Sequence, residues 1–227
     1  HAGHAHHQHQ VRGGSITNLG AGVRIHIAAL NMGWIHVGLA ATLVHVAATH
    51  RVHNLSIEFS GWGVERRPIA SNRNRIARDC PKNAEMLVMI DADCIPPMNF
   101  LDAANADLDI IGLPMPMYDR TGQIMIGIVP LDNREMVDVG SMNVIEASAV
   151  AAGVLFIHRR VLDHPEMCPP FEDRFDKDGV LTWTEDHVFC ERAREQGFRV
   201  WANLGYPLGH VKEIDIRHVW EQSRRKA

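Results

Sequence analysis

Short runs rich in apolar residues alternate with segments of helical periodicity through the first hundred residues. The runs at 23–30, 55–59 and 86–90 have the length and composition of strands buried in a parallel sheet. Between the first two runs, apolar residues recur at the spacing of one helix face, at Val37, Ala40, Ala41, Val44 and Ala48. This alternation predicts right-handed strand-helix-strand units and an α/β fold with a Rossmann-like, mostly parallel sheet flanked by helices.

The later part of the chain continues this pattern less regularly. Pro68 is expected to open a second helix, because proline at the first helical position gives up no hydrogen bond that the helix needs. The remaining predicted elements are strands at 109–113, 150–157 and 199–201, and a helix that runs from Thr184 to about Gln196 and ends at Gly197. Residues 114–143 are rich in Pro, Gly, Met and Asp, with a hairpin expected around 121–123. A segment of this length without helical period favours a substrate loop.

The chain of 227 residues, with 46% hydrophobic content, is expected to form a single domain at 23–211. His1 to Gln10 contain five histidines, and we expect residues 1–22 to be a flexible or purification-derived tail outside the site. Residues 212–227 are expected to form a basic tail. No apolar stretch reaches the roughly 18 residues of a membrane span, and no signal-peptide pattern opens the chain. A cytoplasmic location is therefore expected, in the host cell if the gene is viral.

Charge and cysteine content narrow the classes of partner. A formal charge of -4 gives no general attraction for nucleic acid or anionic membranes, although arginines cluster locally. The four cysteines are widely spaced and form no Cys-x-x-Cys pair. This spacing argues against a zinc knuckle or a disulfide scaffold and fits a reducing compartment.

Asp91-Ala92-Asp93 directly follows the apolar run at 86–90, so both carboxylates are expected at the carboxyl edge of a central strand. Open α/β sheets bind ligands at that edge, and paired carboxylates suit a divalent cation that carries a phosphorylated substrate. The spacing alone is weak evidence, because Asp-x-Asp also occurs at 107–109 and 176–178. The alternative is a solvated turn that favours aspartate.

Arg73 is expected to face the core. Its position on the second predicted helix falls within the apolar stripe of Ile69, Ile76, Ala77 and Cys80. A guanidinium there needs an anion, which is either a structural carboxylate or the diphosphate of a nucleotide. Arg75 and Arg78 point to the opposite side and are expected at the surface.

Two further groups complete the candidate site. Glu185 and Asp186 begin a predicted helix, where acids are favoured in any protein, but a carboxylate beside the sheet edge is also well placed as a general base. Gly209-His210 follows the last predicted strand in an expected loop. The imidazole of His210 is either a hydrogen-bonding filler or a ligand that completes a coordination sphere begun by Asp91 and Asp93, a mixture that Mn²⁺ accepts better than Mg²⁺.

The order of these motifs resembles nucleotide-sugar-dependent glycosyltransferases of the GT-A fold, including compact virus-type, phage-type and soluble bacterial members. The residues that carry the resemblance are Arg73-Asn74, Ile90-Asp91-Ala92-Asp93, Ala152 to Ile157, Glu185 to Cys190 and Gly209-His210. It covers about residues 23 to 211. The chain departs from processive polysaccharide synthases of that fold, because it has no Gln-x-x-Arg-Trp motif and no membrane span.

The resemblance implies a single GT-A domain that uses Mn²⁺ or Mg²⁺ and a nucleotide-diphosphate sugar. The implied metal ligands are Asp91, Asp93 and His210, and the implied donor-binding residues are Asn31, Glu58, Arg73, Asp91, Ala92, Ala152 and Gly153. Asp186 matches the base of inverting members; with retention it would orient the acceptor or sugar instead. The acceptor is open, and a hydroxymethylated pyrimidine in DNA is one candidate beside glycans, proteins and small molecules.

Two other functions remain open from the sequence. A nucleotidyltransferase also couples a parallel sheet to metal-binding aspartates, but it usually carries a glycine-rich basic loop after its first strand, where this chain reads Leu30-Asn31-Met32-Gly33-Trp34. A noncatalytic nucleotide-sugar-binding or metal-binding protein is disfavoured by the simultaneous presence of the candidate ligands and the candidate base.

Overall fold

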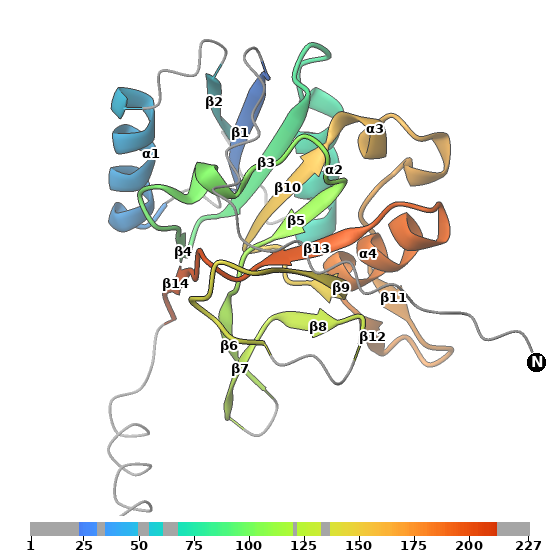
Figure 1. Ribbon diagram of the computed structural model, residues 1–227. Helices are drawn as coiled ribbons and strands as arrows, with labels where there is room; N and C mark the ends of the chain where they lie inside the picture. Colours follow the sequence, from blue (N-terminus) through green and yellow to red (C-terminus); the bar gives the residue numbers. More distant parts are fainter. Residues whose placement is uncertain are drawn as a thin grey trace, which may run out of the picture.

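A computed structural model gives the fold of the chain (Figure 1). It describes residues 23–30, 35–49, 55–60, 68–119, 122–132 and 137–212, and for 55–60 it describes the backbone alone. The first half contains β1 (Ile25–Leu30), α1 (Val37–Thr49), β2 (Leu55–Ser60), α2 (Ile69–Asp79), β3 (Met86–Asp91), β4 (Cys94–Ile95), a 3₁₀ turn (Phe100–Ala103) and β5 (Ile110–Gly112). Among the described residues no helix is both long enough and apolar enough to cross a membrane.

The second half adds two hairpins and the remaining strands and helices. They are β6 (Pro116–Tyr118), β7 (Ile124–Ile126), β8 (Ile128–Pro130), β9 (Val144–Val150), β10 (Val154–His158), α3 (Arg159–Leu162), a 3₁₀ turn (Pro165–Met167), β11 (Arg174–Phe175), β12 (Leu181–Trp183), α4 (Glu185–Glu195), β13 (Val200–Asn203) and β14 (Gly209–His210). The predicted helix after Thr184 is confirmed, and Gly197 follows it with φ +85. The hairpin expected around 121–123 is confirmed as β6 and β7.

One central sheet has the strand order β2-β1-β3-β10-β5-β13-β9-β8. β1 runs parallel to β2 and β3, and β5 runs parallel to β13. β10 is antiparallel to β3 and β5, and β9 is antiparallel to β13 and β8. Six of the eight strands therefore point in one direction and β9 and β10 point in the other, which agrees with the predicted α/β class and its mostly parallel sheet.

The single strand predicted at 150–157 is wrong, because this segment contains the end of one strand and most of another. β9 ends at Val150 and β10 begins at Val154. The two strands are not neighbours: β9 lies between β13 and β8, whereas β10 lies between β3 and β5. An apolar run indicates that a segment is buried, but it does not indicate that one strand ends and another begins at 151–153.

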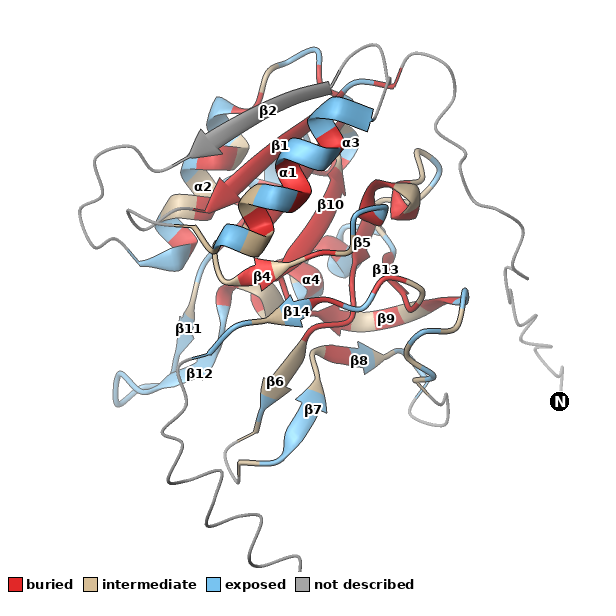
Figure 2. Cartoon of the chain, turned by 90° about the vertical axis from the view of Figure 1, so that its left-hand side faces the viewer, coloured by how far each residue is buried: buried red, intermediate tan, exposed pale blue. Residues whose placement is uncertain are grey.

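The sheet is covered on both faces. Ile25 and Ile27 of β1 belong to the core cluster that contains Leu39 and Leu43 of α1. The alternate residue Ala28 belongs to the other cluster, together with side chains of α2 and α4. Figure 2 views the sheet with α1 in front and α2 and α4 behind, and its central strands are buried. This period-two pattern follows from the alternation of side chains along a strand.

A short antiparallel ladder brings the end of the described chain to the edge where β3 ends. Cys94 of β4 pairs with His210 of β14, and Ile95 pairs with Gly209. The loop expected at Gly209-His210 is thus a short strand. It places His210 beside the segment that follows Asp91-Ala92-Asp93.

Candidate active site

A cavity of about 1110 Å³ lies at the carboxyl ends of β1 and β3. Its volume is sufficient for a nucleotide-sized ligand. The lining includes eight of the residues predicted for the site, namely Arg73, Asp91, Ala92, Asp93, Ala152, Glu185, Asp186 and His210. Asn31 and the side chain of Glu58 lie outside the described residues. The structure thus brings together side chains from α2, β3, α4 and β14.

Gly153 is the predicted site residue that does not line the cavity. A Cβ built at this position would lie 2.4 Å from Met115 Sδ and 2.9 Å from Cys94 Sγ. A larger residue at this position would therefore have to displace the side chains packed behind the site. Its neighbour Ala152 lines the cavity, and its role in leaving room for a donor sugar stays a prediction.

Arg73 is buried as predicted, with 1% of the residue exposed. Its Nη2 donates to Asp91 Oδ1 at 2.9 Å and to Asp91 Oδ2 at 3.2 Å, and its Nε donates to Glu185 Oε1 at 3.0 Å. The remaining nitrogen, Nη1, is buried and has no hydrogen-bond partner among the described residues. The sequence left two partners open for this guanidinium, a structural carboxylate or a nucleotide diphosphate. The structure shows two carboxylates, those of Asp91 and Glu185. The proposed contact of Arg73 with a diphosphate stays a prediction.

The surroundings of Arg73 hold more negative than positive charge. Burial raises the pKa of Asp91 to about 6, although the charge of Arg73 opposes this shift. Burial likewise raises the pKa of Glu185. A single guanidinium shared by two carboxylates leaves a residual negative potential, which attracts a cation and repels a free diphosphate.

Asp186 has a different environment from its neighbour Glu185. Burial opposes its ionisation, but the contacts with His187 and Thr184 outweigh burial and lower the pKa to about 2. Oδ1 accepts hydrogen bonds from the Thr184 hydroxyl at 2.5 Å and from the His187 N–H at 2.9 Å. Asp186 is thus held as a carboxylate at the start of α4, facing the cavity.

His210 is oriented by the backbone. Its Nδ1 lies 2.7 Å from the carbonyl oxygen of Pro116, so Nδ1–H is the donor in this contact. Nε2 then faces Asp93, with 3.3 Å between Nε2 and Oδ2. Two ligands of one ion at about 2.1 Å each lie roughly 3 Å apart, so this spacing fits a shared divalent cation. A carbonyl bonded to the far ring nitrogen is the usual way of orienting a histidine ligand.

Within the described part of the chain, Asp93, Cys94 and His210 form the group of side chains close enough to share one cation, with ligand atoms within 4.8 Å of one another. Asp91, predicted as a ligand, is not in this group and is bonded to Arg73 instead. Burial raises the pKa of the Cys94 thiol far above its usual range, which keeps the sulfur neutral. Within this group the carboxylate of Asp93 and the imidazole of His210 are therefore the candidate metal ligands.

Lys212 belongs to the site, although the sequence predicted it to lie in a basic tail. Its Nζ donates to Asp93 Oδ2 at 2.5 Å, and the side chain lines the cavity. Its position two residues after His210 could have indicated this role, because residues 210 and 212 lie on one side of an extended segment.

These features place the chain among proteins with the glycosyltransferase GT-A fold. No protein-family model and no curated protein sequence matches the chain. The structure is similar to A197 from STIV, at 18% identity and TM-score 0.53, over 84% of this chain and 87% of that chain. It is also similar to GalNAc-T7 crystallised with UDP, GalNAc and Mn²⁺, at 11% identity and TM-score 0.54, over 85% of this chain and 44% of that chain.

A third similar structure is the catalytic domain of Drosophila beta1,4galactosyltransferase 7 in complex with xylobiose. The identity is 14% and the TM-score 0.52, over 84% of this chain and 71% of that chain. At these identities the similarity shows a common fold, and the chemistry has to be argued from the site.

Proposed function

We propose that the protein is a metal-dependent glycosyltransferase that moves a sugar from a nucleoside diphosphate to an acceptor hydroxyl. The observation that carries this proposal is the arrangement of one cavity: Asp93 and His210 converge on one side, and the ionised Asp186 lies at the start of α4. The fold shared with GalNAc-T7, crystallised with UDP and Mn²⁺, supports the same reading.

Asp93 and His210 would hold the divalent cation, which when bound supplies positive charge to the leaving diphosphate. Two ligand atoms are too few for a divalent cation, so phosphate oxygens and water would have to supply the remaining ligands. Asp91 keeps a partly exposed carboxylate, at 21% of its side chain, and can accept a hydrogen bond from the donor while Arg73 holds it in place. Ala92 and Ala152 give the donor room at the cavity wall.

Asp186 would accept the proton of the acceptor hydroxyl as that oxygen attacks the anomeric carbon. Its low pKa makes it a weak base in the free enzyme, so proton transfer would accompany attack, when the hydroxyl becomes acidic. The anomeric carbon would pass through an oxocarbenium-like state and invert. Glu185, tied to Arg73, would set the position of the α4 start.

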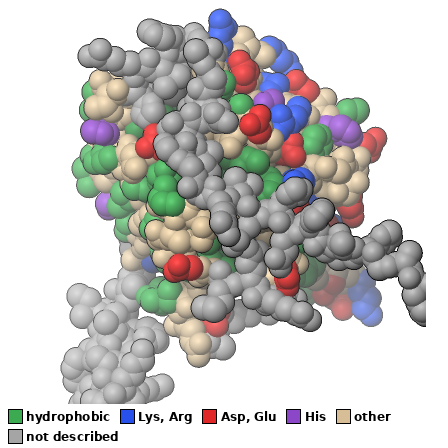
Figure 3. Space-filling view, viewed as in Figure 1, with side chains coloured by type: hydrophobic (Ala, Val, Ile, Leu, Met, Phe, Trp, Pro, Cys, Tyr) green, Lys and Arg blue, Asp and Glu red, His purple; other side chains and the backbone are tan. Residues whose placement is uncertain are grey.

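The cavity favours a neutral acceptor over DNA. The cavity lining includes the apolar or aromatic side chains of Ile69, Tyr118 and Ile124. Phosphate contacts on a duplex require several free cations, whereas Arg73 is buried in ion pairs. On the face shown in Figure 3, acidic and basic side chains are interspersed among the described residues. A glycan or another uncharged hydroxyl compound is therefore the acceptor class that we propose.

The test is turnover of a panel of nucleotide sugars by the purified protein. Released nucleoside diphosphate should require Mn²⁺ and rise with an uncharged glycan acceptor, with a hydroxymethylated DNA duplex as the comparison. Release of pyrophosphate from a nucleoside triphosphate and a sugar phosphate would instead indicate a nucleotidyltransferase. Binding of a nucleotide sugar without turnover, across the full acceptor panel, would indicate the noncatalytic alternative.

A further inference from the structure

Lys212 occupies the position where a cation would meet Asp93. Its ammonium donates to Oδ2 of Asp93 at 2.5 Å, and Nε2 of His210 lies 3.3 Å from the same oxygen. The lysine side chain is 49% exposed, so it is held mainly by this ion pair. The charge of the candidate metal ligand Asp93 is thus balanced by a residue of the chain itself.

A divalent cation and this ammonium compete for one oxygen. A metal ion bound by both Asp93 and His210 would lie about 2.1 Å from Oδ2, close to the ammonium, and the two positive charges would repel each other. Occupation of the site by the metal therefore requires the Lys212 side chain to leave Asp93.

The displaced ammonium stays near the site because its backbone is fixed. The N–H of Val211 donates to the carbonyl of Asp93 at 2.9 Å, next to the Cys94–His210 ladder pair. The long flexible side chain can turn within the cavity, which it already lines. A phosphate oxygen bound to the neighbouring metal would be a nearby anion for it.

We propose that Lys212 alternates between two anions, Asp93 in the metal-free protein and the donor diphosphate in the metal-bound protein. The inference rests on the proposed function and adds a residue that links metal binding to donor binding. Lys212 opposes the metal when it arrives alone and stabilises the complex when metal and diphosphate arrive together. Metal binding releases the ammonium and the diphosphate then binds it, so the two ligands bind with positive coupling.

If Lys212 has this role, one substitution should strengthen the binding of Mn²⁺ alone and weaken the binding of Mn²⁺ together with a diphosphate. Lys212→Met keeps much of the side-chain volume and removes the charge. Binding of Mn²⁺ alone should tighten by about two- to fivefold, the range for release of a half-exposed ion pair. Binding of the Mn²⁺ diphosphate complex should weaken by about tenfold or more, the range for loss of a charge-assisted contact.

The experiment titrates the unmutated protein, Lys212→Met and the control Lys82→Met with Mn²⁺, following free Mn²⁺ by electron paramagnetic resonance. Each titration is repeated with inorganic pyrophosphate and with uridine and guanosine diphosphates. Lys82 is 86% exposed and lies against Asp163, away from the cavity, so its substitution should change neither affinity. Unchanged denaturation midpoints would show that both variants fold.

Opposite changes in the two affinities, seen in Lys212→Met alone, would support the inference. Changes in the same direction, or no change, in a protein that still binds Mn²⁺ and diphosphate would overturn it and leave the proposed function standing. An unmutated protein that binds neither Mn²⁺ nor any of the three diphosphates would overturn the proposed function as well.

Discussion

Nε of Arg73 donates to Oε1 of Glu185 at 3.0 Å, although 112 residues separate them along the chain. The same guanidinium holds Asp91, so one buried side chain of α2 ties the end of β3 to the start of α4. The candidate metal side and the candidate base side of the cavity are thereby fixed relative to each other.

Removal of this bridge should destabilise the fold. Arg73→Ala leaves the buried Glu185 and the partly exposed Asp91 without their cation, and loss of one partner of a buried ion pair costs about 3–5 kcal/mol. Arg75→Ala, on the exposed side of the same helix, should change the free energy of unfolding by less than about 0.5 kcal/mol. Urea denaturation of the two variants measures the difference. Equal losses would show that the buried bridge carries no special share of the stability.

The sequence was sufficient to predict features with a local signal. The helix that begins directly after Pro68, the burial of Arg73 and the glycine after α4 all follow from periodicity or turn chemistry. The end of β3 at Asp91 followed from an unbroken apolar run. These elements together placed the predicted carboxylates at one edge of the sheet.

Features that depend on distant partners were not available from the sequence. The order of the strands, and the division between β9 and β10, depend on pairings between segments far apart in the chain. The partners of Arg73 and the packing of Gly153 against Met115 likewise depend on residues that are distant in the sequence. Lys212 was assigned to a tail because basic residues follow it, although its spacing from His210 placed both on one side.

Asp186→Asn should separate catalysis from binding. Asparagine retains the shape and the helix start but cannot accept a proton, so donor and metal should still bind while glycosyl transfer falls by at least about 10²-fold. Glu191→Gln is the matched control on the same helix, because Glu191 is an exposed partner of Arg174. The measurements are the transfer rates and donor affinities of both variants, compared with those of the unmutated protein. A variant that transfers sugar at nearly the unmutated rate would leave Asp186 as a helix-capping acid.

Asp186 should also contribute a stability term that depends on pH. Its pKa falls from 3.8 to about 2 on folding, so the contribution is complete above pH 4 and is lost as the pH falls toward 2. The full term is about 2 kcal/mol, of which about 1 kcal/mol should disappear between pH 6 and pH 3. Denaturation of the unmutated protein and Asp186→Asn at both pH values gives the difference. A constant difference would mean that the carboxyl is not stabilised as an anion.

Gly153→Ala should disturb the packing of Met115 and of Cys94, which directly follows the cavity-lining residue Asp93. The added Cβ would meet Met115 Sδ at 2.4 Å and Cys94 Sγ at 2.9 Å, so we expect a loss of about 1–3 kcal/mol in the free energy of unfolding. Gly209→Ala, whose nearest contact would be 3.3 Å away, should cost less. Thermal or urea denaturation compares the two. A fully stable Gly153→Ala variant would show that the packing behind Asp93 has room to relax.

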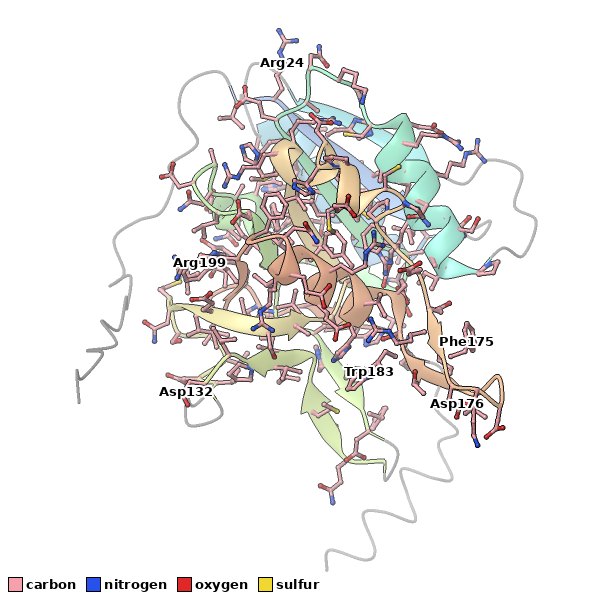
Figure 4. The ribbon with its side chains drawn as sticks, turned by 90° about the vertical axis from the view of Figure 1, so that its right-hand side faces the viewer. Arg24, Asp132, Phe175, Asp176, Trp183 and Arg199 are labelled. Carbon is pink, nitrogen blue, oxygen red and sulfur yellow. The ribbon has the colours of Figure 1, made fainter. Side chains whose placement is uncertain are left out.

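Figure 4 labels Trp183, which stands at the base of the β11–β12 hairpin, while Phe175 and Asp176 lie farther along it. Trp183 is 51% exposed and stacks on His187 at 5.1 Å between ring centroids. Substitution of this tryptophan by alanine should raise the KM for an acceptor more than the KM for the donor, because Trp183 directly precedes Thr184, which lines the cavity. Equal effects on both KM values would contradict an acceptor-side role.

Calorimetry of nucleoside diphosphate binding, with and without Mn²⁺, tests the metal-dependent donor site most directly. Asp93 and His210 supply too few ligands for a complete sphere, and the carboxylates around Arg73 repel a free diphosphate, so each ligand should assist the other. We predict at least about tenfold tighter diphosphate binding with Mn²⁺, within the usual range of coupling between two ligands, and loss of this gain in Asp93→Asn. The same diphosphate affinity with and without Mn²⁺ in the unmutated protein would contradict the account.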